Sequence, residues 1–315
     1  HRGEPAARRT GGTSPPRPHH EERSLTPAMD GLPSSPSRYQ SSPEGETHRP
    51  MEERVQVPEY APGESGSSSQ ARSRRLDLFG APGTYLLVGV NCAVFLWMVL
   101  HGVSAQSPTP NDLVRFGANY TGSVLNHGEW YRLLTATFVH VGWIHLGTNM
   151  WCLWNLGLLG EPLLGPYGLV AVYMLTGVAG NLLSTAVNLL QGNDGSVGAG
   201  ASGAVFGIAG ILIVLLSNRR LPIPWEELRR LRRSVIQFAV LNLVIGGATA
   251  IPGLQIVRID NMAHLGGFFS GLALGGPLAP RMTAGRQRYL GRQKITFGIA
   301  ALLLSLFGYL IANLR

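Results

Sequence analysis

A serine at the start of an apolar stretch is the strongest candidate for a nucleophile in this chain. Ser202 follows the glycine-rich connection 191–200 and opens the apolar run Ser202–Leu216. Glycines let a backbone approach a substrate carbonyl closely, and the free N–H groups of a helix N-terminus can hold a developing oxyanion. The same residues would also suit an N-cap serine followed by a Gly203-x-x-x-Gly207 helix-packing face. The soluble G-x-S-x-G nucleophile elbow is absent, because alanine stands two residues after the serine.

A histidine about one turn inside another apolar run could serve as the base for this serine. Burial disfavours a charged imidazole, so His264 would stay neutral and able to accept a proton. Small residues recur every four positions along the same run: Ala263, Gly267, Gly271 and Gly275. We expect this face to lie against Gly203 and Gly207, which would bring His264 to Ser202. A structural histidine that is hydrogen-bonded between helices is the alternative.

A second polar pair opens a different apolar run. His145 and Asn149 are four residues apart, share one face of a helix and can both donate hydrogen bonds. They could therefore stabilise an oxyanion, or they could simply bond neighbouring helices to one another. His140 is off this spacing, and we expect it to help structure the preceding loop.

Other hydrolytic chemistries do not suit the sequence. Zinc hydrolysis would require an H-E-x-x-H motif or a similar one, and no acid stands between His140 and His145. An aspartyl mechanism needs two aspartates inside the membrane, but Asp194 and Asp260 lie in connections between the apolar runs. Asp260 could orient His264, yet its place at the water boundary favours a Ser–His dyad over a triad. No metal or cofactor is expected.

The candidate residues lie in the apolar part of a chain with two unlike parts. Of the 315 residues, 45% are hydrophobic and 14% are charged, and the charges are concentrated at the N-terminus. Residues 1–80 are rich in Ser, Pro, Gly, Arg and Glu, which predicts a disordered tail. The remainder contains long uncharged stretches of membrane-span length. This division excludes a soluble globular enzyme and a fully disordered chain.

Seven apolar runs indicate an all-α polytopic membrane protein. They are Tyr85–Leu100, Ile144–Leu159, Tyr167–Leu190, Ser202–Leu216, Val235–Ile251, Ala263–Leu278 and Ile295–Leu310. Their glycine content is typical of closely packed membrane helices. We expect three parts: a disordered cytoplasmic tail at 1–80, a six-helix core at 81–278, and a basic loop with a seventh helix at 279–315.

The distribution of basic residues predicts the orientation. With the tail in the cytoplasm, cytoplasmic segments hold 22 of the 26 basic residues and the opposite side holds 4. The N-terminus is then inside, the C-terminus is outside, and the polar clusters lie in the outer half of the membrane. This topogenic role accounts for the net charge of +8 without nucleic-acid binding. The aromatic segment Gly102–Trp143 is expected to lie in the outer membrane interface.

Four short motifs, taken together, resemble the rhomboid family of intramembrane serine proteases. They are Glu129-Trp-Tyr-Arg132, His145-x-x-x-Asn149, Gly200-Ala-Ser202-Gly203-Ala-Val-Phe-Gly207 and Ala263-His264-Leu-Gly-Gly267. They occur in the family's order and on the expected spans. The resemblance covers about Tyr85–Pro277.

The resemblance implies roles for individual residues. Ser202 would be the nucleophile and His264 the general base, while His145 and Asn149 would line the oxyanion hole. Phe206 would lie against the base, without the hydroxyl that a tyrosine has in some members. Supporting positions would be Gly200, Gly203, Gly267 and the loop residue Arg132.

The resemblance also implies an arrangement and a location. A six-helix core followed by one extra helix suits a bacterial cytoplasmic membrane, with the active site opening to the outer side; a eukaryotic secretory membrane is the alternative. The mitochondrial type carries its extra helix at the N-terminus and would put the serine on the fifth span. The expected activity is an intramembrane endopeptidase acting on transmembrane segments.

Two other functions stay open at this stage. An inactive rhomboid-like protein would bind client transmembrane helices, although such proteins lose the serine or the histidine and both are present here. A transporter would need a polar pathway through both halves of the membrane, often with inverted repeats, and the sequence shows neither. The substrate and the oligomeric state are not predicted.

Overall fold

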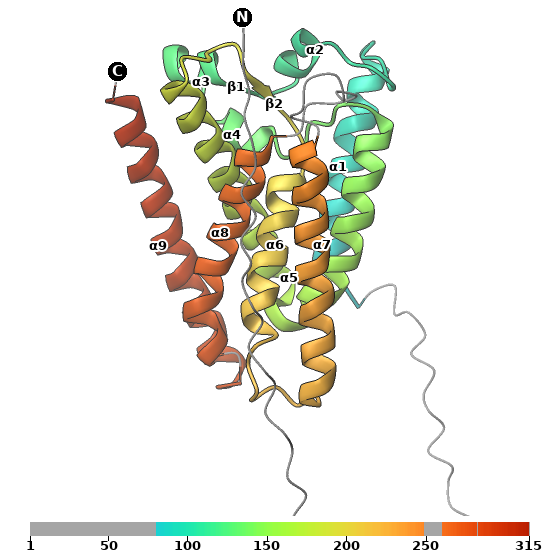
Figure 1. Cartoon of the computed structure of the whole chain (residues 1–315), viewed down its shortest axis with the longest axis vertical. Helices are drawn as coiled ribbons and strands as arrows, with labels where there is room; N and C mark the ends of the chain where they lie inside the picture. Colours follow the sequence, from blue (N-terminus) through green and yellow to red (C-terminus); the bar gives the residue numbers. More distant parts are fainter. Residues whose placement is uncertain (1–79, 249–259, 282, 315) are drawn as a thin grey trace, which may run out of the picture. The chain divides into compact units, whose positions relative to one another are not determined.

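The structure is a computed structural model that describes residues 80–248, 260–281 and 283–314. Within these residues the regular structure is almost entirely helical (Figure 1). The longer helices are α1 (Pro82–Leu100), α5 (Trp143–Leu190), α6 (Ser202–Leu215), α7 (Trp225–Ala248), α8 (Asn261–Leu278) and α9 (Arg286–Ala312). The predicted disordered tail lies outside the described residues except for residue 80, as does the end of the predicted run Val235–Ile251.

Short elements fill the segment between α1 and α5. They are α2 (Pro110–Arg115), β1 (Asn119–Tyr120), α3 (Thr121–His127) and α4 (Arg132–Thr135). β1 pairs antiparallel with β2 (Val197–Gly198), so that Asn119 stands opposite Gly198. This pairing ties the segment between α1 and α5 to the glycine-rich connection before α6. A short 3-10 helix, Ala279–Arg281, follows α8.

The helix α5 is two helices joined by a sharp reversal, and it contains the second and third predicted runs. Gly165 has φ 74°, a left-handed conformation that glycine adopts readily, and Pro162 and Pro166 flank it. A straight helix of 48 residues would be about 70 Å long. The hydrocarbon core is only about 30 Å thick. The reversal, visible in the green ribbon of Figure 1, therefore gives two segments of crossing length.

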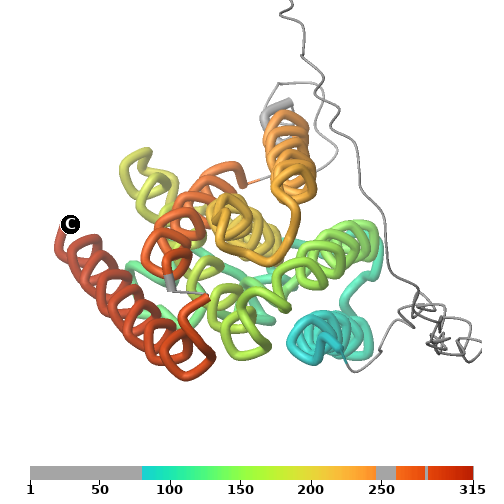
Figure 2. The backbone as a smooth tube through the Cα atoms, turned by 90° about the horizontal axis from the view of Figure 1, so that it is seen from below, coloured from blue at the N-terminus to red at the C-terminus, as the bar shows by residue number. Residues whose placement is uncertain are grey.

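The helices form a membrane bundle with α6 at its centre. In the part of the chain that the structure describes, α1, α5 and α9 are long and apolar enough to cross a membrane. The shorter α6 lies among α5, α7 and α8 (Figure 2). Every residue from Gly203 to Leu212 is buried, as expected for a helix that is apolar on all sides. The all-α polytopic fold with an additional C-terminal helix is confirmed.

Small residues let α6 and α8 approach closely, as the four-residue repeat predicts. A Cβ atom at Gly267 would collide with the carbonyl oxygen of Gly203, and one at Gly271 would collide with that of Gly207. A Cβ atom at Gly275 would lie 2.6 Å from the side chain of Val214. Because no larger residue fits at these positions, the two helices are held in one register.

The start of α1 is capped by a carboxylate from the α5 reversal. Ala81 provides no side-chain cap. Instead, Glu161 accepts hydrogen bonds from the N–H groups of Gly83 and Thr84 and from the Thr84 hydroxyl, each at 2.7 Å. Glu161 is only 4% exposed. A negative charge at a helix N-terminus is favourable, so this buried acid joins two spans. No local sequence motif predicts this role for Glu161.

The segment between α1 and α5 is held together by Arg132. Its guanidinium donates to the carbonyl oxygens of Val114 at 2.6 Å and Ala118 at 3.2 Å, and to the Glu129 carboxylate at 2.5 Å. The hydrogen bond from Arg132 lowers the pKa of the Glu129 carboxyl. Arg132 therefore fixes the fold of the loop and stands apart from the candidate catalytic residues.

Candidate active site

Ser202 is the first residue of α6 and is half-buried. The chain reaches it through Gly200, whose φ of 132° lies in a region that side chains avoid. The Gly200 N–H donates to the carbonyl oxygen of Ala136 at 2.9 Å, which fixes the approach to the helix. α6 has no side-chain cap at Ala201. The first N–H groups of the helix therefore point out of its N-terminal end, beside Ser202.

His264 lies in the first turns of α8 and is 5% exposed. The carbonyl of the preceding residue, Ala263, lies against α6: a Cβ atom at Gly203 would be 3.2 Å from that oxygen. It also faces α5, because a Cβ atom at Gly180 would be 2.5 Å from the same oxygen. Since Gly203 follows Ser202 and Ala263 precedes His264, the two candidate residues stand at one end of the α6–α8 contact.

The ring of Phe206 holds His264 over the face of α6 that carries Ser202. The two rings stack with centroids 4.4 Å apart and planes 15° apart. Phe206 is four residues after Ser202, so the two share one face of the helix. The stack therefore holds the imidazole on the side of α6 that carries Ser202.

The imidazole of His264 has no carboxylate partner in the described structure. Its Nδ1 atom is buried and has no hydrogen-bond partner among the residues that the structure describes. Asp260 uses one carboxylate oxygen to cap α8 through the N–H of Ala263 at 3.0 Å. The other oxygen accepts from the hydroxyl of Ser184 at 2.5 Å. Asp260 therefore positions the helix that carries His264, and both of its carboxylate oxygens have other partners.

His145 and Asn149 lie on α5 beside the backbone that leads into α6. A Cβ atom at Gly200 would be 2.6 Å from Cε1 and 3.1 Å from Nε2 of His145, and 3.8 Å from Nδ2 of Asn149. The Asn149 amide donates to the His145 carbonyl oxygen at 3.0 Å, which fixes its orientation. Position 200 must therefore be glycine for these two side chains to reach the start of α6.

The hydrogen bonding of His145 defines which ring nitrogen can donate. Its Nδ1 accepts from the N–H of Val141 at 3.3 Å. In a neutral imidazole the other nitrogen then carries the proton. Nε2–H thus points a donor toward the segment that enters α6, where an oxyanion would need one.

His140 supports the segment that leads into α6. It is fully buried, and its Nε2 lies 3.5 Å from the N–H of Ala201 while its Nδ1 lies 3.2 Å from the carbonyl oxygen of Phe138. Burial lowers its pKa to about 3, and the nearby His145 acts in the same direction. His140 is therefore a neutral scaffold for the residue before Ser202.

A row of polar residues on the second half of α5 bonds to segments around the site, and the sequence motifs did not predict it. The row consists of Asn181, Ser184, Thr185 and Asn188. Asn181 bonds to the Leu133 carbonyl oxygen, and Ser184 bonds to Asp260. Thr185 bonds to Asn119, and Asn188 bonds to Thr121. The spacing of three and four residues within an apolar run was the available signal.

No group of three or more His, Cys, Asp or Glu residues in the described ranges could hold a metal ion. The two cysteines have no bridging role: Cys92 is exposed and free, and Cys152 is free and partly buried.

Comparison with known proteins places these residues in one family. Residues 127–281 match the Rhomboid domain. The chain is 34% identical over 201 residues to "Rhomboid protease GluP" of Bacillus subtilis (strain 168), covering 62% of this chain and 35% of that protein. It is 30% identical over 203 residues to "Rhomboid protease AarA" of Providencia stuartii, covering 60% of this chain and 69% of that protein. It is 34% identical over 157 residues to "Rhomboid-like protein 11, chloroplastic" of Arabidopsis thaliana, covering 47% of this chain and 52% of that protein. The chain thus spans about a third of the first relative and about half of the third.

Proposed function

The chain belongs to the rhomboid family, and we propose that it is a serine-type endopeptidase that cleaves transmembrane segments of membrane proteins. The observation that carries this proposal is the stack of Phe206 on His264, which holds an imidazole on the Ser202 face of α6. Two relatives whose names include the word protease support the same reaction class.

In the proposed mechanism Ser202 is the nucleophile and His264 is the base. The Ser202 oxygen attacks the carbonyl carbon of the substrate peptide bond while its proton moves to His264. The tetrahedral intermediate collapses, the C–N bond breaks, and His264 gives the proton to the leaving amine. Water, deprotonated by His264, then hydrolyses the acyl-enzyme. The two carboxylate bonds of Asp260 and the unpartnered Nδ1 of His264 favour a dyad over a triad.

The oxyanion that forms in both steps would be held by three donors. They are the N–H of Ser202, the Nε2–H of His145 and the free amide hydrogen of Asn149. The close approach of His145 and Asn149 to Gly200 supports this assignment. Donors fixed in a site that excludes water stabilise the developing charge strongly, and losing one typically costs about 100- to 1,000-fold in rate.

We further propose the arrangement in the membrane. The residues 81–278 form the protease core, and 279–315 add the basic loop and the seventh helix. The distribution of basic residues supports an N-terminus in the cytoplasm and a site at the outer side. The extra helix after the core supports a bacterial cytoplasmic membrane. Substrates would be single-span proteins whose helix unwinds near small or helix-breaking residues, since a peptide bond in an intact helix is shielded.

A paired cleavage assay tests the proposal. The full chain is reconstituted in liposomes with a single-span substrate that carries helix-breaking residues near its outer end, and products are identified by mass spectrometry. We expect Ser202→Ala and His264→Ala to lose cleavage by several orders of magnitude. Matched controls are Ser234→Ala on α7 and His127→Ala on α3, both exposed. Normal cleavage by Ser202→Ala would refute the dyad, and binding of the substrate without cleavage by the unaltered chain would favour an inactive client-binding protein.

A further inference from the structure

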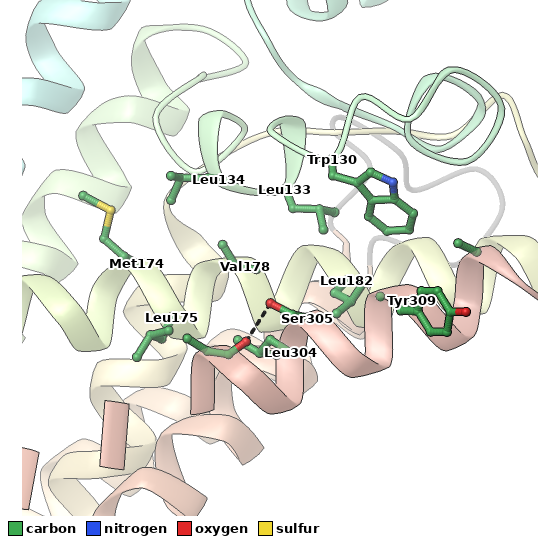
Figure 3. Close-up of a pocket in the computed structure, with 13 residues that line it drawn as sticks. Trp130, Leu133, Leu134, Met174, Leu175, Val178, Leu182, Leu304, Ser305 and Tyr309 are labelled. Atoms are coloured by element: carbon green, nitrogen blue, oxygen red, sulfur yellow. Dashed lines mark hydrogen bonds between the residues drawn. The ribbon is translucent and has the colours of Figure 1, made fainter. Parts of the chain in front are cut away.

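An apolar cavity of about 610 Å³ lies between the segment around α4, the second half of α5, and α9 (Figure 3). None of the candidate catalytic residues lines it. The lining consists of Trp130, Leu133, Leu134, Met174, Leu175, Val178, Leu182, Ala301, Leu304, Ser305, Gly308, Tyr309 and Ala312. The cavity therefore separates the extra C-terminal helix from the core at this level of the bundle.

The walls of the cavity are fixed by contacts outside it. The amide of Asn181 donates to the carbonyl oxygen of Leu133 at 2.8 Å, which holds the α4 wall on α5. At the end nearer the C-terminus, a Cβ atom at Gly308 would lie 3.6 Å from the ring of Trp130. At its other end α9 is anchored by Gln293, which is fully buried and donates to the Leu164 carbonyl oxygen at 2.7 Å. The cavity is thus built into the way that α9 attaches to the core.

The chemistry of the lining selects hydrocarbon over water. The hydroxyl of Ser305 is already bonded to the Ala301 carbonyl oxygen at 2.9 Å within α9, as the dashed line in Figure 3 shows. A stable buried water needs two to four polar partners. Apart from the polar ends of Trp130 and Tyr309, the remaining lining is apolar. Two of the walls, α5 and α9, are helices of membrane-spanning character, so the medium that reaches the cavity is lipid.

The cavity is small for a whole helix. A helix with its side chains is about 10 Å across and takes up about 420 Å³ per turn, which is more than two-thirds of the cavity volume. A flexible acyl chain can instead follow the cavity along several turns of α9. Trp130 and Tyr309 lie together at one end, where paired aromatic residues usually mark the headgroup level (Figure 3).

We propose that this cavity binds one acyl chain of a membrane phospholipid, with the headgroup beside Trp130 and Tyr309. The chain completes the contact between α9 and the core, which the Gln293 hydrogen bond makes directly at the other end of the helix. The proposal does not depend on the protease activity proposed above.

Photolabelling tests this site. The full chain is reconstituted in phosphatidylcholine liposomes that contain a small fraction of phosphatidylcholine with a diazirine on its acyl chain. After irradiation, labelled residues are mapped by mass spectrometry. We expect labels in Leu175–Leu182 and Leu304–Ala312 to exceed, by several-fold, those on the exposed α1 residues Leu96 and Trp97.

Filling the cavity is the critical comparison. Val178→Trp on α5 and Ser305→Trp on α9 fill it from opposite walls, and each is expected to reduce the cavity labels several-fold while α1 labels persist. Val244→Trp is the matched control, because Val244 is a lipid-exposed residue of α7 outside the cavity. Melting temperatures identify any variant that fails to fold. Labelling of the cavity no stronger than that of α1, or unchanged in folded Ser305→Trp, would overturn the proposal.

Discussion

The ring of Phe206 stacks on the ring of His264 at 4.4 Å and 15°, and this contact joins α6 to α8 beside the proposed nucleophile. A leucine at position 206 would fill similar space without a flat surface for the imidazole. We expect Phe206→Leu to lower kcat about tenfold or more, because small displacements of a catalytic group are costly. Phe206→Tyr keeps the ring and should retain most of the activity.

The measurement is kcat and KM in proteoliposomes, with the melting temperature as a check on folding. A positioning role predicts a fall in kcat with little change in KM. Equal activity of the leucine variant and the unaltered chain, at equal stability, would show that the stack is not needed.

The bond between Asp260 and Ser184 should control the position of the α8 start. Ser184→Ala removes the 2.5 Å hydrogen bond and leaves the α8 cap in place. We expect it to cost about 1 kcal/mol of stability. Asp260→Ala removes the cap as well, which adds about 1 kcal/mol. Both variants should lower kcat, since His264 is one turn from the cap.

A double-mutant cycle separates this pair from its neighbours. If Asp260 and Ser184 act through their mutual bond, the two changes are non-additive by about 1 kcal/mol or more. Thermal unfolding in detergent micelles gives the values. Additive losses would mean that the two residues act independently.

Glu161 should be one of the more important stabilising residues away from the site. Glu161→Ala removes three charge-assisted hydrogen bonds and leaves the buried N–H groups of Gly83 and Thr84 without an acceptor. A loss of about 3 kcal/mol or more is expected. Glu161→Gln, which keeps one oxygen acceptor, should lose less. Glu226→Ala, an exposed acid on α7, is the control and should change the melting temperature little.

Apolar patterning and the small-residue repeat were sufficient to predict most of the fold from the sequence. The run Ala263–Leu278 matches α8 within two residues. The close contact between Gly267 and Gly203 could be predicted because both residues lack a side chain. The run that begins at Val235 starts ten residues after the helix itself, at Trp225, because the first turns of α7 are charged and hydropathy does not detect them.

Other features could not be predicted because distant segments create them. α2 to α4 depend on the hydrogen bonds of Arg132 to Val114 and Ala118, which no local propensity encodes. The capping of α1 by Glu161 spans 78 residues of sequence. The candidate catalytic residues could be named from motifs, but the tautomer of His145 requires the position of the Val141 N–H.

The close glycine contact between α6 and α8 predicts that a change of glycine to alanine has different effects at different positions of α8. Gly267→Ala places a Cβ atom into the Gly203 carbonyl, and neither backbone can move without displacing Ser202 or His264. We expect a loss of about 1–3 kcal/mol and a larger loss of cleavage. Gly276→Ala is the control on α8, since a Cβ there meets nothing within 4 Å. Similar activity in the two variants would contradict this account.

Acid should weaken the segment that supports Ser202, because His140 is buried in its neutral form. Its folded pKa of about 3 lies below the unfolded value of 6.5, so the unfolded chain binds the proton more readily between these values. The stability from neutral His140 is complete above pH 6.5 and falls as the pH drops toward 3. We expect His140→Gln, which cannot titrate, to show a smaller fall in melting temperature between pH 7 and pH 5 than the unaltered chain. Carboxyl groups titrate mostly below this interval, and His145, whose ring lies 5.4 Å away, is present in both proteins. An identical pH dependence in the two would mean that His140 is not the group responsible.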